Sequence, residues 1–133
     1  MVLVDTTIWS KAYRRKKIVN DEHNLAVKKL ISILNKGEEV LIGSVRQELL
    51  SGISNKEVFN DLLLKLDGFN NYEAKLADYD LAAEYFNICA SKGIQGSQTD
   101  FLICAIAYRY DLEIFTEDKD FDNYKKFLPI KLC

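Results

Sequence analysis

The feature of this sequence that most constrains the fold is a short apolar run at its start. Val2, Leu3 and Val4 follow one another without a polar residue, and the run stops at Asp5. A continuous apolar run, rather than an alternating one, is typical of a strand buried on both faces of a parallel sheet. Open α/β sheets carry their ligand sites at the carboxyl ends of the strands. Asp5 therefore stands where a ligand site is expected.

Similar apolar runs alternate with helical segments along the rest of the chain. Besides the first strand, we expect strands at Val40–Ile42, briefly around Tyr72, at Leu112–Phe115 and, as an edge strand, at Pro129–Leu132. We expect helices at Thr6–Tyr13 with Thr6 and Thr7 as candidate caps, from Asn20 or Asp21 to Gly37, from a cap at Ser44 to Gly52, from Ser54 or Asn55 to Gly68, at Leu76–Lys92, at Gln98–Tyr110, and shortly after the fourth strand. This alternation predicts an α/β fold with a mainly parallel sheet, helices on both faces and all strand ends on one edge. A chain of 133 residues is expected to form one domain, 1–133.

Charge and residue usage exclude several classes of protein. The formal net charge of −2 argues against a protein that binds nucleic acid through an overall positive field. The local basic run Arg14–Lys17 leaves two interpretations open, a contact with an RNA backbone or an acidic partner, and a solvated loop. The three cysteines form no C-x-x-C pair, which argues against zinc and redox sites. His23 is the one histidine, so paired-histidine catalysis is excluded.

The sequence offers no segment suited to a membrane. No basic stretch precedes the first apolar run, as a signal peptide would require. The longest apolar stretch, Phe101–Tyr108, is much shorter than the roughly 20 residues that span a bilayer. We therefore expect a cytoplasmic protein without a membrane partner.

Acidic residues recur at the predicted carboxyl edge of the sheet. They are Asp5 after the first strand, Glu48 in the helix after the second, Asp100 at the start of the buried helix, Asp118 after the fourth strand, and Asp120 close by. At about 5 Å and an effective dielectric near 20, each pair of such carboxylates repels by roughly 3 kcal/mol, so a cation is expected among them. Oxygen ligands without histidine or cysteine favour Mg²⁺ or Mn²⁺ over zinc.

Such a centre has the chemistry of a hydrolytic nuclease. Bound divalent ions lower the pKa of a water nucleophile and neutralise charge on a phosphodiester. The aspartates would bind the metal, Glu48 would bind metal or position the attacking water, and the hydroxyl of Thr116 or Ser97 would hold a ligand or phosphate. Each acid also has a structural interpretation: Asp100 in a capping box with Ser97, Glu48 as a solvated helix residue, and Asp118 and Asp120 as turn formers.

Four segments of the chain resemble the PIN domain in their order and approximate spacing. These segments are Val2–Trp9, Ser44–Gly52, Thr99–Ala107 and Phe115–Phe121. The resemblance covers essentially the whole chain and extends to the VapC-like toxins of type II toxin–antitoxin systems.

The resemblance implies a three-layer α/β/α sandwich around a Rossmann-like sheet, and a Mg²⁺- or Mn²⁺-dependent endoribonuclease. It also implies a homodimer and a cognate antitoxin that covers the active site. The acids of the family motif fall on Asp5, Glu48, Asp100 and Asp118, with Thr116 as the hydroxyl before the last acid and Asp120 as an auxiliary ligand.

Three other functions remain open at this point. One is a PIN nuclease of RNA processing outside toxin–antitoxin systems. A second is a phospho-acceptor receiver module, which would need an aspartate at the end of a central strand and a lysine after a late strand. The third is a protein-binding α/β module in which the acids are only caps, and this alternative predicts no stabilisation by divalent ions.

Overall fold

Five short strands form one parallel sheet in this protein. The structure is a computed structural model that describes residues 1–13 and 21–133, with only the backbone described at 21–24. The strands are β1 (Val2–Val4), β2 (Glu39–Ile42), β3 (Asn71–Tyr72), β4 (Glu113–Phe115) and β5 (Lys131–Leu132). Their order across the sheet is β3-β2-β1-β4-β5, and every neighbouring pair is parallel. The predicted parallel sheet is confirmed, including the brief strand at Tyr72 and the final edge strand.

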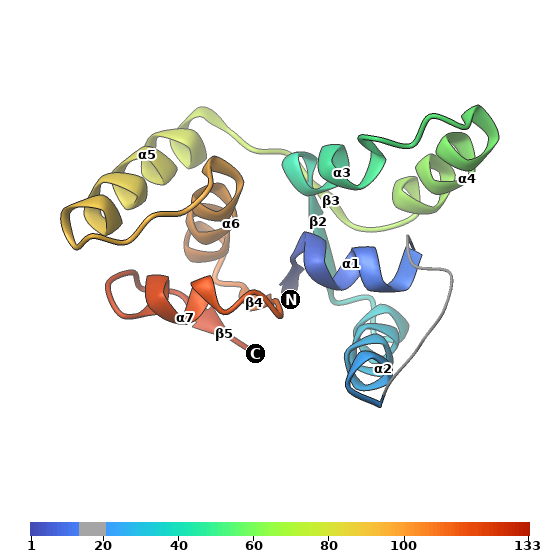
Figure 1. Cartoon of the computed structure of the whole chain (residues 1–133), viewed down its shortest axis with the longest axis horizontal. Coiled ribbons are helices and arrows are strands. Elements are labelled where there is room, and N and C mark those ends of the chain that lie inside the picture. The colour runs from blue at the N-terminus through green and yellow to red at the C-terminus, as the bar shows by residue number, and fades with distance from the viewer. Residues whose placement is uncertain (14–20) are drawn as a thin grey trace.

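Helices cover both faces of the sheet and complete a three-layer sandwich. They are α1 (Thr6–Tyr13), α2 (Asp21–Asn35), α3 (Gly43–Leu50), α4 (Lys56–Asp67), α5 (Leu76–Ser91), α6 (Gln98–Arg109) and α7 (Asp120–Lys125). Helices α1 to α4 lie on one side of the sheet and α5 to α7 on the other (Figure 1). The chain moves outward from β1 to β3 along one half of the sheet, and then crosses back to β4 and β5 on the other half. The predicted α/β/α architecture is confirmed.

The first strand lies at the centre of the sheet because its sequence tolerates burial on both faces. Leu3 pairs with Val40 of β2 on one side and with Ile114 of β4 on the other, and all three side chains are fully buried. The order of the strands reverses at β1, which makes the gap between the carboxyl ends of β1 and β4 the switch point of the sheet. In open α/β sheets this is where ligands bind. Asp5 directly follows β1 at this point.

Helix α3 begins closer to its strand than the sequence indicated. Helix α3 starts at Gly43, with Ile42 in extended backbone at the N-cap position and no side-chain cap. Ser44 is already inside the helix, and its Oγ is buried without a hydrogen-bond partner in the described part of the chain. The prediction that Ser44 caps this helix was therefore wrong. The caps at Asn55 and Ser97 are confirmed, since each side chain accepts a backbone N–H of the following turn.

Some expectations fall on residues that lie outside the described part of the chain. These are the basic run 14–17, the alternative helix cap at Asn20 and the side chain of His23. Among the helices that are described, none is both long enough and apolar enough to cross a membrane.

Candidate metal centre

Asp5 is a buried carboxylate held by three donors at the carboxyl end of β1. Its side chain is 5% exposed. The backbone N–H of Thr6 donates to Oδ1 at 2.7 Å, and the hydroxyls of Thr7 and Thr116 donate to Oδ2 at 3.1 and 2.7 Å. Burial raises the pKa of Asp5, and the bond from Thr116 is the largest effect that opposes it. The three donors thus offset part of the cost of keeping a charge here.

The threonines after β1 bind carboxylates instead of capping α1. Thr6 donates its hydroxyl to Glu48 Oε2 at 2.7 Å, and Thr7 donates to Asp5. Helix α1 begins at Thr6 itself. The prediction that Thr6 and Thr7 act as helix caps was wrong, because their hydroxyls donate to Glu48 of α3 and to Asp5 at the end of β1.

Thr116 connects the ends of β1 and β4. Its hydroxyl donates to Asp5 and accepts the backbone N–H of Asp118 at 2.9 Å. Asp118 Oδ1 in turn accepts the backbone N–H of Asp120 at 2.9 Å. The Thr116 hydroxyl therefore spends its one proton on Asp5 and accepts from the backbone of Asp118, so Thr116 positions the two acids relative to each other.

Asp100 comes from the first turn of α6, on the opposite face of the sheet from Glu48. Ser97 Oγ accepts the backbone N–H of Asp100 at 3.0 Å, so half of the predicted capping box is present. The Asp100 carboxylate does not complete the box; its Oδ2 accepts the hydroxyl of Tyr124 at 2.7 Å. Burial raises the pKa of Asp100, with a smaller contribution from the charges of Asp5 and Asp118 and opposition from the Tyr124 bond.

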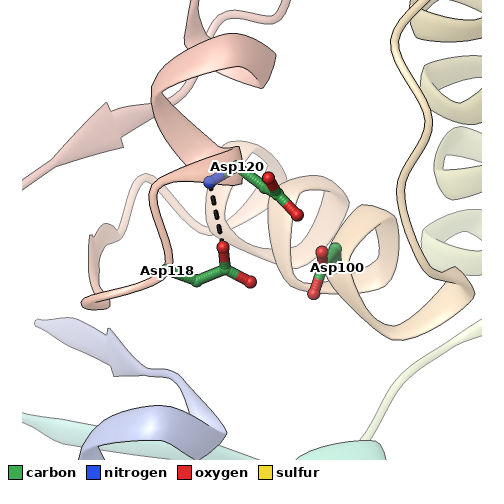
Figure 2. A group of neighbouring side chains, drawn as sticks. All are labelled: Asp100, Asp118 and Asp120. Carbon is green, nitrogen blue, oxygen red and sulfur yellow. Dashed lines mark hydrogen bonds between the residues drawn. The ribbon is translucent and has the colours of Figure 1, made fainter.

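Three carboxylates meet at the mouth of the site. Asp100, Asp118 and Asp120 each place one oxygen within 4.8 Å of the others. Figure 2 shows them converging from the start of α6, from the loop before α7 and from the first residue of α7. Asp118 and Asp120 were alternatives for the fourth acid of the motif, and both belong to this group; Asp118 is half-buried and Asp120 is exposed.

Asp5 and Glu48 lie outside this tight group but line the same pocket. The pocket has a volume of about 610 Å³, and all five predicted acids border it. Ser97 and Lys11 also line it, whereas Thr116 lies behind Asp5 and does not. Lys11 forms an ion pair with Glu117 at 2.5 Å.

The residues present fit a hard divalent cation. In the described chain, no lysine or arginine forms an ion pair with any of the five acids. Two unit charges 4.8 Å apart repel by about 0.9 kcal/mol even at the dielectric of water, and by about 3.5 kcal/mol at an effective value of 20. The pocket offers carboxylate and hydroxyl oxygens but neither histidine nor cysteine, a donor set that suits Mg²⁺ or Mn²⁺.

Sequence reasoning missed Tyr124 and Gly96, which lie next to Asp100. Tyr124 is 24 positions from Asp100 and carries no motif that marks it as part of the site. Only the packing of α7 against α6 brings its hydroxyl there. Gly96 borders the Tyr124 ring, and it could have been noticed only as a loop glycine shortly before Asp100.

The protein is a parallel α/β sandwich in which carboxylates converge at the switch point of the sheet. Such a site is suited to a divalent metal ion. The family model of the PIN domain matches residues 2–127, and the chain therefore belongs to the PIN domain family. PIN domains are nucleases and generally use a divalent metal. No match was found among curated protein sequences.

Solved structures share the fold across nearly the whole chain. A crystal structure of FitAcB from Neisseria gonorrhoeae has a TM-score of 0.77 at 19% identity, covering 99% of this chain and 96% of that one. VapBC2 from Rickettsia felis, bound to a DNA fragment from its promoter, has a TM-score of 0.73 at 14% identity and the same coverage. A toxin–antitoxin complex from Klebsiella pneumoniae has a TM-score of 0.68 at 15% identity, covering 90% and 88%. At these identities the likeness shows a common fold.

Proposed function

We propose that this protein is a Mg²⁺- or Mn²⁺-dependent endoribonuclease, formed as one nuclease domain over residues 1–133, and the toxin of a toxin–antitoxin pair. The observation that carries the proposal is the convergence of Asp100, Asp118 and Asp120 within 4.8 Å, in a pocket that Asp5 and Glu48 also line. Membership of the PIN family and the four matching sequence segments support it.

Each acid has a role that follows from its surroundings. Asp5, Asp100, Asp118 and Asp120 hold the metal, because their oxygens line one pocket and lack cationic partners in the described chain. Thr6 fixes Glu48 through a 2.7 Å hydrogen bond, so that Glu48 can accept a proton from, or orient, an attacking water. Thr116 acts through Asp5 and Asp118 rather than on the substrate.

A divalent ion bound here would supply a more acidic water and would offset negative charge on the scissile phosphate. The protein's own contribution is to hold the carboxylates deprotonated and correctly spaced. Burial raises the pKa of Asp5, and the three donors around it keep that rise in check.

A second hollow beside the acids provides room for nucleotides next to the scissile bond. It has a volume of about 560 Å³, and its lining includes Gln47 and Thr99, the sequence neighbours of Glu48 and Asp100. Tyr72 and Tyr79 contribute aromatic surface to it. Apart from Glu73 the lining is uncharged, and its polar groups and tyrosines suit unpaired RNA bases, which proteins bind by stacking and hydrogen bonding.

Cleavage of a mixed RNA panel, including transfer RNAs, tests the proposal. Wild type and Asp100→Asn are purified in parallel and assayed with Mg²⁺ and with Mn²⁺, with and without a chelator. The control variant is Asp80→Asn, because Asp80 is exposed on α5 and does not line the pocket. We expect chelator-sensitive cleavage by wild type and Asp80→Asn, and loss of cleavage in Asp100→Asn.

Equal cleavage by wild type and Asp100→Asn would contradict the proposal, because it would come from a contaminating ribonuclease. If none of the variants cuts any RNA, thermal unfolding in Mn²⁺ decides whether the acids form a metal site or serve only as caps. No stabilisation of wild type by Mn²⁺ would favour the module in which the acids serve only as caps.

The proposed partners are an antitoxin and a second copy of the chain, in the cytoplasm. Support comes from the resemblance to VapC-like toxins and from a structural neighbour described as a toxin–antitoxin complex. Helix α5 also exposes apolar side chains, among them Leu76 and Ile88, which a dimer would cover.

Expression of the protein alone should arrest growth, and co-expression of a small adjacent reading frame should restore it. A processing nuclease outside toxin–antitoxin systems would cleave RNA without arresting growth. Light scattering after gel filtration tests the dimer, and a monomer mass of 15.3 kDa would exclude it under those conditions.

A further inference from the structure

Tyr124 places a buried hydroxyl against one of the proposed metal ligands. The residue lies on α7 with none of its surface exposed, between the rings of Phe101 and Phe121 at centroid distances of 5.0 and 5.1 Å. These contacts fix the ring, and the hydroxyl donates to Asp100 Oδ2 at 2.7 Å. The orientation of the Asp100 carboxylate is therefore set from the protein interior.

The second oxygen of Asp100 is left for a ligand. Among the described residues Oδ1 accepts no hydrogen bond, and the carboxylate lies beside those of Asp118 and Asp120 (Figure 2). Tyr124 thus holds Oδ2 of Asp100, while the Asp100 carboxylate lines the acidic pocket. This division resembles the arrangement in metal sites, where an outer hydrogen bond fixes each ligating group.

Gly96 leaves the space that this arrangement needs. A Cβ at position 96 would lie 2.4 Å from Tyr124 Oη and 2.9 Å from Phe101 Cε2, far closer than atoms in contact. The φ angle of Gly96 is not positive, so the backbone does not require glycine. The requirement is steric, because any side chain at this position would displace the ring or the hydroxyl of Tyr124.

We propose that Tyr124 is a positioning residue that holds the Asp100 carboxylate in the orientation a divalent cation requires, and that Gly96 keeps the room for its hydroxyl. This inference rests on the proposed function, since it takes Asp100 as a metal ligand. Loss of a hydrogen bond of this kind typically weakens metal binding by about 10- to 100-fold.

Calorimetric titration of the RNA-free protein with Mn²⁺ tests the inference without relying on cleavage. Tyr124→Phe removes only the hydroxyl, and the matched control is Tyr85→Phe. Tyr85 is also buried, but it does not line the acidic pocket and its hydroxyl makes no hydrogen bond within the described chain. We expect Mn²⁺ to bind Tyr124→Phe at least 10-fold more weakly than wild type, and Tyr85→Phe with unchanged affinity.

Gly96→Ala provides a second, independent variant. Alone it should also weaken Mn²⁺ binding, because the new methyl group displaces the Tyr124 hydroxyl. In a Tyr124→Phe background the same substitution should weaken binding much less, because the hydrogen bond is already absent. Additive effects in the double variant would contradict the proposed link between the two residues.

Asp100→Asn separates failure of the inference from failure of the proposed function. If wild type binds Mn²⁺ and Asp100→Asn does not, the metal site stands, and an unchanged affinity in Tyr124→Phe overturns the role of Tyr124 alone. If wild type binds no Mn²⁺, the proposed function and the inference fail together.

Discussion

Replacing Thr116 by valine removes the hydroxyl that links the ends of β1 and β4 while keeping the shape of the side chain. The substitution deletes the 2.7 Å bond to Asp5 and leaves the Asp118 N–H without its 2.9 Å partner. Hydrogen bonds to charged groups contribute about 1.5–3 kcal/mol. Thr116 is half-buried, so water replaces part of the bond, and we take the low end, about 1.5 kcal/mol.

A loss of about 1.5 kcal/mol makes the charged form of Asp5 roughly 10-fold less favourable and so raises the pKa of Asp5 further. The direction is clear, because burial already raises the pKa of Asp5 and the Thr116 bond is the largest effect that opposes it. A metal competes with the proton for this carboxylate. The acid limb of Mn²⁺ binding should therefore move about one unit toward higher pH in Thr116→Val.

Calorimetric Mn²⁺ titrations over a series of pH values measure this shift. Thr7→Val should shift the acid limb less, because its bond to Asp5 is longer, at 3.1 Å. Thr99→Val is the control, since Thr99 is also half-buried and lies next to Asp100 but donates to no carboxylate in the described chain. An acid limb that stays in place in Thr116→Val, or that moves equally in Thr99→Val, would refute the reasoning.

Three further predictions concern stability. Asp100→Asn should unfold at a higher temperature than wild type in chelator at neutral pH. Burial raises the pKa of Asp100 in the folded protein above its ordinary value of 3.8, so wild type loses stability as the pH rises from that value through the folded-state pKa. The difference in unfolding temperature between the two proteins should vanish below that pH range. Mn²⁺ at about 100 times its dissociation constant should stabilise wild type by about 2.7 kcal/mol and Asp100→Asn much less, so a thermal scan that shows equal gains contradicts the site. Asp78→Ala should lower the free energy of unfolding by at least about 1–2 kcal/mol in urea, because the buried carboxylate both accepts the Lys75 N–H at the start of α5 and pairs with Arg109. Asp80→Ala on the same helix should change it by less than about 0.5 kcal/mol, and equal effects would exclude the structural role of Asp78.

The edge that carries the site could be predicted because it depends on a few strong patterns. Val2–Val4 is apolar without a break, and Leu112–Phe115 is apolar except at Glu113, which indicates two largely buried strands. Parallel pairing then places the carboxyl ends of both strands together, and Asp5 and Asp118 follow those ends. No long-range information is needed for this step.

The detailed roles of the acids could not be predicted, because they depend on side-chain packing between distant elements. A capping box and a metal ligand demand the same residue at position 100, and only the direction of the carboxylate separates them. That direction is set by Tyr124, whose ring is placed by Phe101 and Phe121. Spacing along the chain gives no signal for such a contact.

Helix starts were misjudged where a helix follows a strand without a loop. The rule that serine or threonine precedes a helix assumes a free N-cap position. Here Ile42 fills that position at the end of β2, so Ser44 lies in the first turn of α3. After β1, Thr6 and Thr7 already lie inside α1, and their hydroxyls donate to the carboxylates of Glu48 and Asp5 rather than accept a backbone N–H as a cap does.

Anomalous X-ray scattering from crystals of the protein grown with Mn²⁺ is the most direct test of the central claim, that the acids at the carboxyl edge of the sheet form a metal centre. The account predicts an anomalous peak in the acidic pocket, within bonding distance of Asp100 and Asp118, that is lost in Asp100→Asn. A pocket without such a peak at saturating Mn²⁺, or a peak found only at other surface acids, would contradict it.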